Sequence, residues 1–189
     1  MKIFYTCTTR SLMDDYMFHI QLIARLKEEG HKITYEWIEG AYENIKKGIV
    51  GDTEKFYEQK QNAIKNSEVV IVEGSYKSFS IGHQITVALQ KAKPTLVLYR
   101  NNDEIKNNES YVEGIKSDWL IERPYKNIDH AVESVKAFLK MYKNANKYRF
   151  NLVLSQPENM FLEELMKDNH KTKTQLIKDL IRKEMDKKI

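Results

Sequence analysis

Polar side chains that could hold a small molecule follow one of the apolar segments of this sequence. The stretch SFSIGHQI supplies Ser78, Ser80, His83 and Gln84. Serine hydroxyls and the free backbone N–H groups at the start of a helix can hold a phosphate group or a ribose. The same serines could equally be ordinary helix caps. His83 could stack on a ligand or could be a structural histidine, and Gln84 is an amide where a carboxylate would be the more useful catalytic group.

Two further polar groups stand at the ends of apolar segments. The stretch TCTTR follows the first segment and ends at Arg10. Because a guanidinium binds phosphate oxygens in pairs, Arg10 is a candidate for phosphate binding, with a solvated surface arginine as the alternative. Glu73 stands near the end of the segment EVVIVEG and could point into a crevice. Its alternative roles are to cap the following loop or to pair with Lys77.

The elements that must position these residues alternate between strand and helix along the chain. Strands are expected at 2–7, 32–39, 68–74, 94–100 and 118–125. Helices are expected at 11–30, 53–67, 81–92 and 127–145, and a loop with room for one helical turn at 40–52. This alternation predicts an α/β fold with a doubly wound, mostly parallel, five-stranded sheet and helices on both faces. Ligands bind such sheets beyond the carboxyl ends of the strands, where the strand order reverses.

Composition narrows the class of protein. The chain has 189 residues and is 41% hydrophobic, which predicts one domain of ordinary size, or one domain with a small appendage. Its net charge of +4 hints weakly at an anionic partner. Cys7 is the single cysteine and favours a reducing compartment, so we expect a cytoplasmic protein. We expect no signal peptide and no membrane span. No dinucleotide or P-loop motif and no metal-ligand spacing is present, so neither a cofactor nor a metal is expected.

The segment 67–99 resembles the nucleoside 2-deoxyribosyltransferase superfamily, which includes the 2′-deoxynucleoside 5′-phosphate N-hydrolases. The pattern of that superfamily is a strand beginning with Asp, a loop ending in Ser, and small-x-Gly-aromatic-Glu opening a helix. An Ala and a strand starting at Pro follow. The matching positions in this chain are Glu68, Ser78, Ser80, Gly82, His83, Gln84, Ala88 and Pro94. Glutamine therefore stands where the family has its catalytic glutamate, and Glu68 replaces the aspartate.

The resemblance covers most of residues 1–145 and implies a nucleotide-binding domain there. It implies that Tyr5, Thr6 and Thr8 line a nucleoside pocket. In this family a carboxylate attacks the anomeric carbon of the sugar, or stabilises the positive charge that grows as the base leaves. Gln84 has nearly the same shape but no charge, so it can hydrogen-bond a sugar hydroxyl and cannot form a glycosyl ester. The side chain of Glu68 is one methylene longer than the family aspartate, so whether it keeps the orienting role of that aspartate stays open.

Three hypotheses follow from this domain. The first is a protein that binds a nucleoside or nucleotide, has lost its nucleophile and, if the C-terminal residues contact DNA, is a regulator. The second is an active N-glycosidase or deoxyribosyltransferase, in which Glu73 substitutes for the nucleophile or Gln84 is an engineered substitution. The third is an interaction protein in which the domain is only a scaffold, and it predicts no saturable binding of nucleotides.

The residues after a linker at 143–148 form a second unit, 148–189. An alternating pattern predicts a short strand at 150–154, and two amphipathic helices follow it. Thr172 and Gln175 have the spacing of a capping box at the start of the second helix. About 40 residues cannot bury a core alone, so we expect a homodimer or a higher oligomer.

The order strand, helix, helix over 148–187 resembles the ribbon-helix-helix family of DNA-binding dimers. The resemblance implies that two strands pair across a dimer and enter the major groove of duplex DNA. By position, Arg149, Asn151 and Val153 would face bases, and Thr172, Lys173 and Thr174 would contact phosphate. Val153 can contact only a thymine methyl group, so the alternative is a unit that dimerises without binding DNA.

Overall fold

A parallel sheet of five strands forms the centre of the first of two compact units, Met1–Arg149 and Phe150–Ile189. The computed structural model describes residues 1–100, 114–143, 152–169 and 171–187. The strands are β1 (Lys2–Cys7), β2 (Lys32–Ile33), β3 (Val69–Glu73), β4 (Thr95–Arg100) and β5 (Leu120–Tyr125). Their spatial order is β2-β1-β3-β4-β5, and each neighbouring pair is parallel. The predicted five-stranded α/β fold is confirmed.

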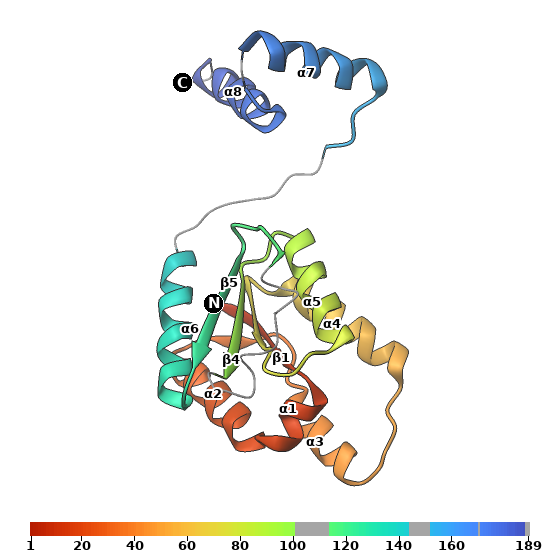
Figure 1. Ribbon diagram of the computed structural model, residues 1–189, viewed down its shortest axis with the longest axis vertical. Coiled ribbons are helices and arrows are strands. Elements are labelled where there is room, and N and C mark those ends of the chain that lie inside the picture. Colours follow the sequence, from red (N-terminus) through yellow and green to blue (C-terminus); the bar gives the residue numbers. More distant parts are fainter. Residues whose placement is uncertain (101–113, 144–151, 170, 188–189) are drawn as a thin grey trace. The chain divides into compact units, whose positions relative to one another are not determined.

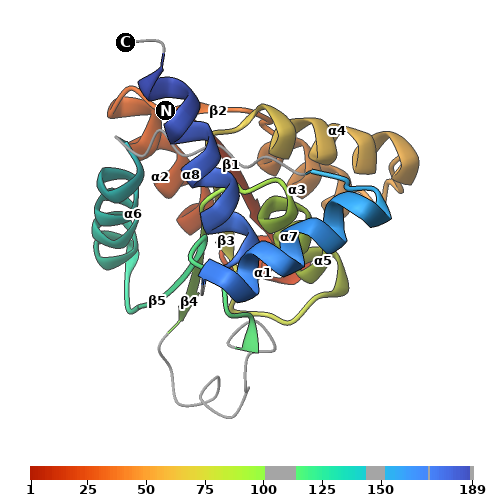
Figure 2. The same cartoon turned by 90° about the horizontal axis from the view of Figure 1, so that it is seen from above.

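Helices cover both faces of this sheet (Figures 1 and 2). On one face pack α2 (Tyr16–Glu28) and α6 (Ile128–Tyr142). On the other face pack α4 (Thr53–Asn66) and α5 (Phe79–Gln90). The chain therefore leaves β1 toward one face and β3 toward the other, and the strand order reverses at this pair. A crevice for a ligand is expected at such a point.

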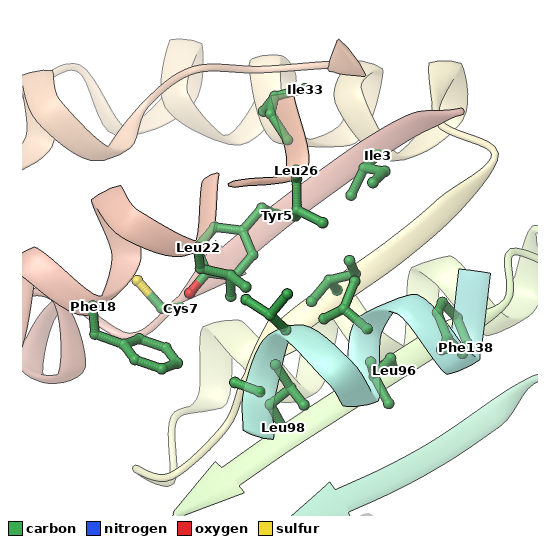
Figure 3. Packing of buried hydrophobic residues seen from close by; sticks show 14 of the residues in the cluster. Ile3, Tyr5, Cys7, Phe18, Leu22, Leu26, Ile33, Leu96, Leu98 and Phe138 are labelled. Atoms are coloured by element: carbon green, nitrogen blue, oxygen red, sulfur yellow. The ribbon is translucent and has the colours of Figure 1, made fainter. Parts of the chain in front are cut away.

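The side chains of β1 alternate between the two faces, as the pleat of a strand requires. Ile3, Tyr5 and Cys7 belong to the apolar cluster beneath α2 and α6, which Figure 3 shows from close by. Phe4 belongs to the cluster beneath α4 and α5. By the same alternation Thr6, which is fully buried, faces the α4 and α5 side of the sheet.

The second strand is shorter than predicted. β2 ends at Ile33, and a helix, α3 (Ile38–Lys46), occupies much of the segment predicted as a loop. Trp37 turns inward and its Nε1 donates a hydrogen bond of 3.0 Å to the Tyr5 carbonyl. Ile38 is buried and the apolar positions that follow it recur at helical spacing against the same cluster. The strand predicted over 32–39 is confirmed only at Lys32–Ile33, because Trp37 bonds to the Tyr5 carbonyl and the chain turns into α3 instead of continuing beside β1.

The first helical region is also divided. A short helix, α1 (Thr9–Asp14), precedes α2, and Asp15 separates them with φ −147° and ψ 53°. Thr8 begins α1 because its side chain accepts a hydrogen bond from the Ser11 N–H. The Asp15 carboxylate accepts a hydrogen bond of 2.5 Å from Arg100 at the end of β4. The break thus places an acidic side chain over the carboxyl edge of the sheet.

The second unit contains two helices, α7 (Gln156–Asn169) and α8 (Lys173–Asp186). They pack on each other through Leu162 and Leu176, and the predicted capping box is present at Thr172. Of the strand predicted at 150–154, Phe150 and Asn151 lie outside the described residues, and 152–154 is not in a strand. A strand needs a hydrogen-bonded neighbour, and this single chain supplies none there among the residues described. Within the described ranges no helix has the length and apolarity to cross a membrane.

Candidate functional site

The carboxyl ends of β1 and β3 lie side by side at the point where the strand order reverses. Cys7 and Glu73, the last residues of the two strands, are direct partners in the parallel register. Gly74 follows, and a Cβ atom there would lie 2.8 Å from the Cγ1 of Val97. Only glycine therefore fits where the chain leaves β3 close to β4. The stretch SFSIGHQI comes next and opens α5 over this edge.

Gln84 is almost completely buried, with 5% of its surface exposed. Its Nε2 donates a hydrogen bond of 3.1 Å to the Ser80 carbonyl, and its Oε1 has no partner within the described chain. Thr6 Oγ1 and Gln61 Nε2 are likewise buried without a described partner. These three atoms come from β1, α4 and α5, which share one face of the sheet. Buried polar atoms nearly always have partners, so this layer has the character of a binding site.

The polar residues around the start of α5 are open to solvent. Ser78 is the N-cap residue, and its side chain makes no capping hydrogen bond. Ser80 and His83 are exposed, and nothing lies within 4 Å of a Cβ placed at Gly82. The His83 ring stacks on Tyr57 of α4 at 5.8 Å between centroids. The hydroxyls and first N–H groups of α5 are thus free to contact an anion or a sugar.

Glu73 lies inside the protein rather than at the surface. Its carboxylate is fully buried and accepts hydrogen bonds from the hydroxyls of Ser11 and Ser75. It also accepts from the Ser75 N–H at 3.2 Å and from the Tyr125 hydroxyl at 3.0 Å. Four donors thus surround its two oxygens, an arrangement that suits a carboxylate anion. Glu73 joins the loops after β1 and β3 to the end of β5.

A buried histidine continues this network. Ser11 Oγ is 3.2 Å from His19 Nε2, and the Tyr5 hydroxyl is 2.6 Å from His19 Nδ1. Burial lowers the pKa of His19, which favours the neutral ring at pH 7. Because the Tyr5 hydroxyl can donate to Nδ1, the proton of the neutral ring belongs on Nε2, facing Ser11. Tyr5, which the resemblance placed in the nucleoside pocket, is fully buried in this network.

Two other predicted residues occupy different surroundings. Glu68 is exposed at the amino end of β3, where its carboxylate accepts a hydrogen bond of 2.6 Å from the Lys2 N–H. It therefore lies at the opposite edge of the sheet from Gln84. Arg10 is exposed near the carboxyl edge, 3.7 Å from Asp14, and its guanidinium lies 4.6 Å from the centre of the Tyr76 ring. The structure thus brings Thr6, Thr8, Arg10 and the start of α5 to one edge and leaves Glu68 outside it.

Two features of this edge were not predicted from the sequence. Lys60 of α4 lies over the Trp37 ring, with Nζ 3.9 Å from its centre. A cleft of about 360 Å³ also opens at the carboxyl ends of β4 and β5, with Arg100, Tyr125 and Lys126 in its wall. Lys60 could have been noticed, because it precedes Ala63 and Ile64 by one helical turn on an apolar face. The residues that line the cleft come from segments distant in sequence, so no short sequence motif predicts it.

Comparison with known proteins supports the resemblance found in the sequence. No family model matches the chain. A 5-hydroxymethyl-dUMP N-hydrolase from Rattus norvegicus is 22% identical over 99 residues, which are 52% of this chain and 61% of that protein. A solved structure of a Clostridium botulinum CMP N-glycosidase has a TM-score of 0.52 at 14% identity and covers 72% of this chain and 99% of that one. The chain resembles the nucleoside 2-deoxyribosyltransferase and N-hydrolase superfamily.

The likeness to the solved N-glycosidase, at its low identity, shows a shared fold. The match to the rat N-hydrolase spans less than two thirds of that protein's length. Within the superfamily pattern, the structure places Gln84 in the second turn of α5, buried beneath the carboxyl edge. The position that matches the family glutamate therefore lies at the carboxyl edge of the sheet, and this chain has an amide there.

Proposed function

We propose that the N-terminal unit binds a nucleoside 5′-monophosphate at the carboxyl edge of β1 and β3 and cleaves its N-glycosidic bond. The support is the family resemblance together with one observation, the buried amide oxygen of Gln84, which has no hydrogen-bond partner among the residues that the structure describes. One similar protein is named an N-hydrolase of 5-hydroxymethyl-dUMP and the other an N-glycosidase of CMP. A sugar hydroxyl or a water molecule is the natural partner for the Gln84 oxygen in such a reaction.

The side chain of Gln84 limits the chemistry of the proposed site. As the base departs, positive charge develops on the sugar ring, and an anion beside it lowers the barrier. An amide oxygen carries only a partial negative charge and cannot form a covalent glycosyl intermediate. Water must then attack the sugar directly, with Gln84 accepting a hydrogen bond from the water or from a hydroxyl. We therefore expect slow hydrolysis rather than efficient turnover.

The neutral side chain of Gln84 also favours a second candidate function, that of a nucleotide receptor without turnover. In this function the same edge binds the ligand, and the three unpartnered polar atoms are satisfied on binding. The two functions predict the same affinity and differ only in whether base is released.

Measuring the melting temperature and the release of free base with a panel of nucleosides and nucleoside 5′-monophosphates distinguishes the glycosidase from the receptor. We expect at least one monophosphate to raise the melting temperature, because a ligand at 100 times its dissociation constant stabilises the fold by about 2.7 kcal/mol. Chromatography of the same samples measures the free base. Slow base release supports the glycosidase, and a shift without release supports the receptor. A panel with neither shift nor release contradicts both functions.

We further propose that the second unit joins two copies of the chain. Its two helices leave large apolar side chains exposed, among them Met160, Phe161, Leu180, Ile181 and Met185, each more than half exposed. Two short helices with only Leu162 and Leu176 buried cannot form a stable core without a partner. A second copy of the same helices would cover this surface.

Removal of residues 148–189 tests this proposal and the DNA contact together. We expect sedimentation to show a dimer or larger oligomer for the full chain and a smaller species after the deletion. DNA contact through Thr172, Lys173 and Thr174 predicts binding to duplex DNA that weakens steeply with salt and disappears with the deletion. In the described structure, the Lys173 ammonium donates to Asn159 and Glu163 at 2.6 and 3.1 Å. It would have to leave these partners, so salt-independent or absent DNA binding leaves dimerisation as the role of the unit.

A further inference from the structure

Lys60 occupies a position of α4 where an apolar side chain would be expected. Ala63 and Ile64, one turn further along the helix, are buried against the sheet in the cluster that includes Phe4. Lys60 lies on the same helix face. Because side chains of a helix tilt toward its amino terminus, Lys60 extends toward the start of α4, at the carboxyl edge of the sheet.

The charge of Lys60 has no described anionic partner. Its Nζ lies 3.9 Å from the centre of the Trp37 ring and 4.7 Å from that of Phe56. No described carboxylate or carbonyl oxygen lies within hydrogen-bond or ion-pair distance of it. Burial lowers the pKa of Lys60 to about 8, since leaving water disfavours the cation. Partly buried charges are normally paired with an opposite charge. An ammonium whose contacts within the described ranges are two aromatic rings is therefore suited to bind an anion.

The surroundings place this charge near the carboxyl end of β1 and beside α5. The Lys60 cation counteracts, in part, the rise in the pKa of Cys7 that burial causes, and Cys7 is the last residue of β1. Helices α4 and α5 are neighbours, and the Tyr57 and His83 rings stack between them. Lys60 therefore belongs to the same layer as Thr6 and Gln84.

We propose that Lys60 binds the phosphate group of the nucleotide and so sets the preference of the site for phosphorylated nucleosides. The inference rests on the proposed nucleotide site. A phosphate dianion matches a compact ammonium that has no counter-charge among the described residues, and the Trp37 and Phe56 rings lie against it. Bound phosphate would also restore the protonated form of Lys60, because an adjacent anion favours the cation.

Calorimetric titration of Lys60→Met with a nucleoside and its 5′-monophosphate tests the inference. Methionine keeps the apolar stem and removes the charge, and the loss of an unpaired buried cation should leave the melting temperature equal or higher. We expect the monophosphate to bind about 10- to 100-fold more weakly, as loss of a charge-assisted contact predicts. We expect the affinity for the nucleoside to stay unchanged. Lys65→Met, an exposed position of the same helix with the same loss of charge, is the control.

The pH dependence supplies a second readout. Lys60 in the free protein is mostly a cation below its pKa of about 8 and mostly neutral above it. The preference of the unmodified chain for the monophosphate should therefore fall between pH 7 and 9, and Lys60→Met should show no such fall. The nucleoside phosphates themselves keep a constant charge above pH 7.

The outcomes separate the two proposals. If neither ligand binds the unmodified chain, the nucleotide site fails and the role of Lys60 fails with it. If both ligands bind and Lys60→Met weakens them equally, or weakens neither, the phosphate role of Lys60 is wrong while the nucleotide site stands. If inorganic phosphate competes with the monophosphate in the unmodified chain but not in Lys60→Met, the assignment to the phosphate group is supported.

Discussion

Gln84→Glu is expected to accelerate base release from the preferred nucleoside monophosphate by about 100-fold or more. A glutamate there places a full negative charge beside the sugar as positive charge develops on it, and removal of one such group commonly costs that much in rate. The change adds no bulk, and Gln84 is already held in the second turn of α5 under the carboxyl edge. The new carboxylate must turn away from the Ser80 carbonyl, because the hydrogen bond from Nε2 is lost.

Single-turnover measurement of free base, with enzyme in excess over nucleotide, gives the rate of the chemical step. Mass spectrometry of the quenched reaction then shows whether a glycosyl group is attached to residue 84. A glutamate can form this ester and a glutamine cannot. Gln90→Glu, at the exposed end of the same helix, changes the net charge equally and should not alter the rate. An unchanged rate in Gln84→Glu would mean that the amide does not limit the chemistry and that the ligand lies elsewhere.

The sequence predicted a strand or helix correctly wherever a single short segment contained the apolar run or the helical spacing that identifies it. The buried strands at β1, β3 and β4 are continuous apolar runs, and α4 and α6 have apolar residues at helical spacing. The prediction failed at Trp37, because whether a β-favouring segment continues as a strand depends on a partner elsewhere. Here that partner is the Tyr5 carbonyl, which accepts from the Trp37 indole and turns the chain into α3.

The candidate site was predictable only in part, for a similar reason. The motif around Gln84 is local, so its place over the carboxyl edge followed from the order of the elements. The partners of Glu73 are not local, since Ser11 and Tyr125 are 62 and 52 residues away in the sequence. A sequence pattern can place a carboxylate at the end of a strand, but it does not identify the hydrogen-bond donors that will contact that carboxylate. Lys60 was missed because a single lysine on an amphipathic helix is usually read as solvated.

Glu73→Gln is expected to lower the free energy of unfolding by roughly 2–4 kcal/mol. The buried carboxylate accepts from two serine hydroxyls, one backbone N–H and the Tyr125 hydroxyl. An amide of the same shape offers one acceptor oxygen and a donor NH₂ group, so at least one donor must reorient or stay unpaired. Urea denaturation followed by circular dichroism measures the change. Glu68→Gln is the matched control, since it alters an exposed carboxylate with one described hydrogen bond and should change stability by less than about 1 kcal/mol.

The same variant decides whether Glu73 is the substitute nucleophile. A carboxylate whose two oxygens accept from four donors must break this network to reach a sugar. We therefore expect Glu73→Gln, assayed where it is fully folded, to keep base release within about 10-fold of the unmodified chain. Abolished release with unchanged stability would instead show that Glu73 acts on the substrate. In that case the network around it would be a resting arrangement that opens when the nucleotide binds.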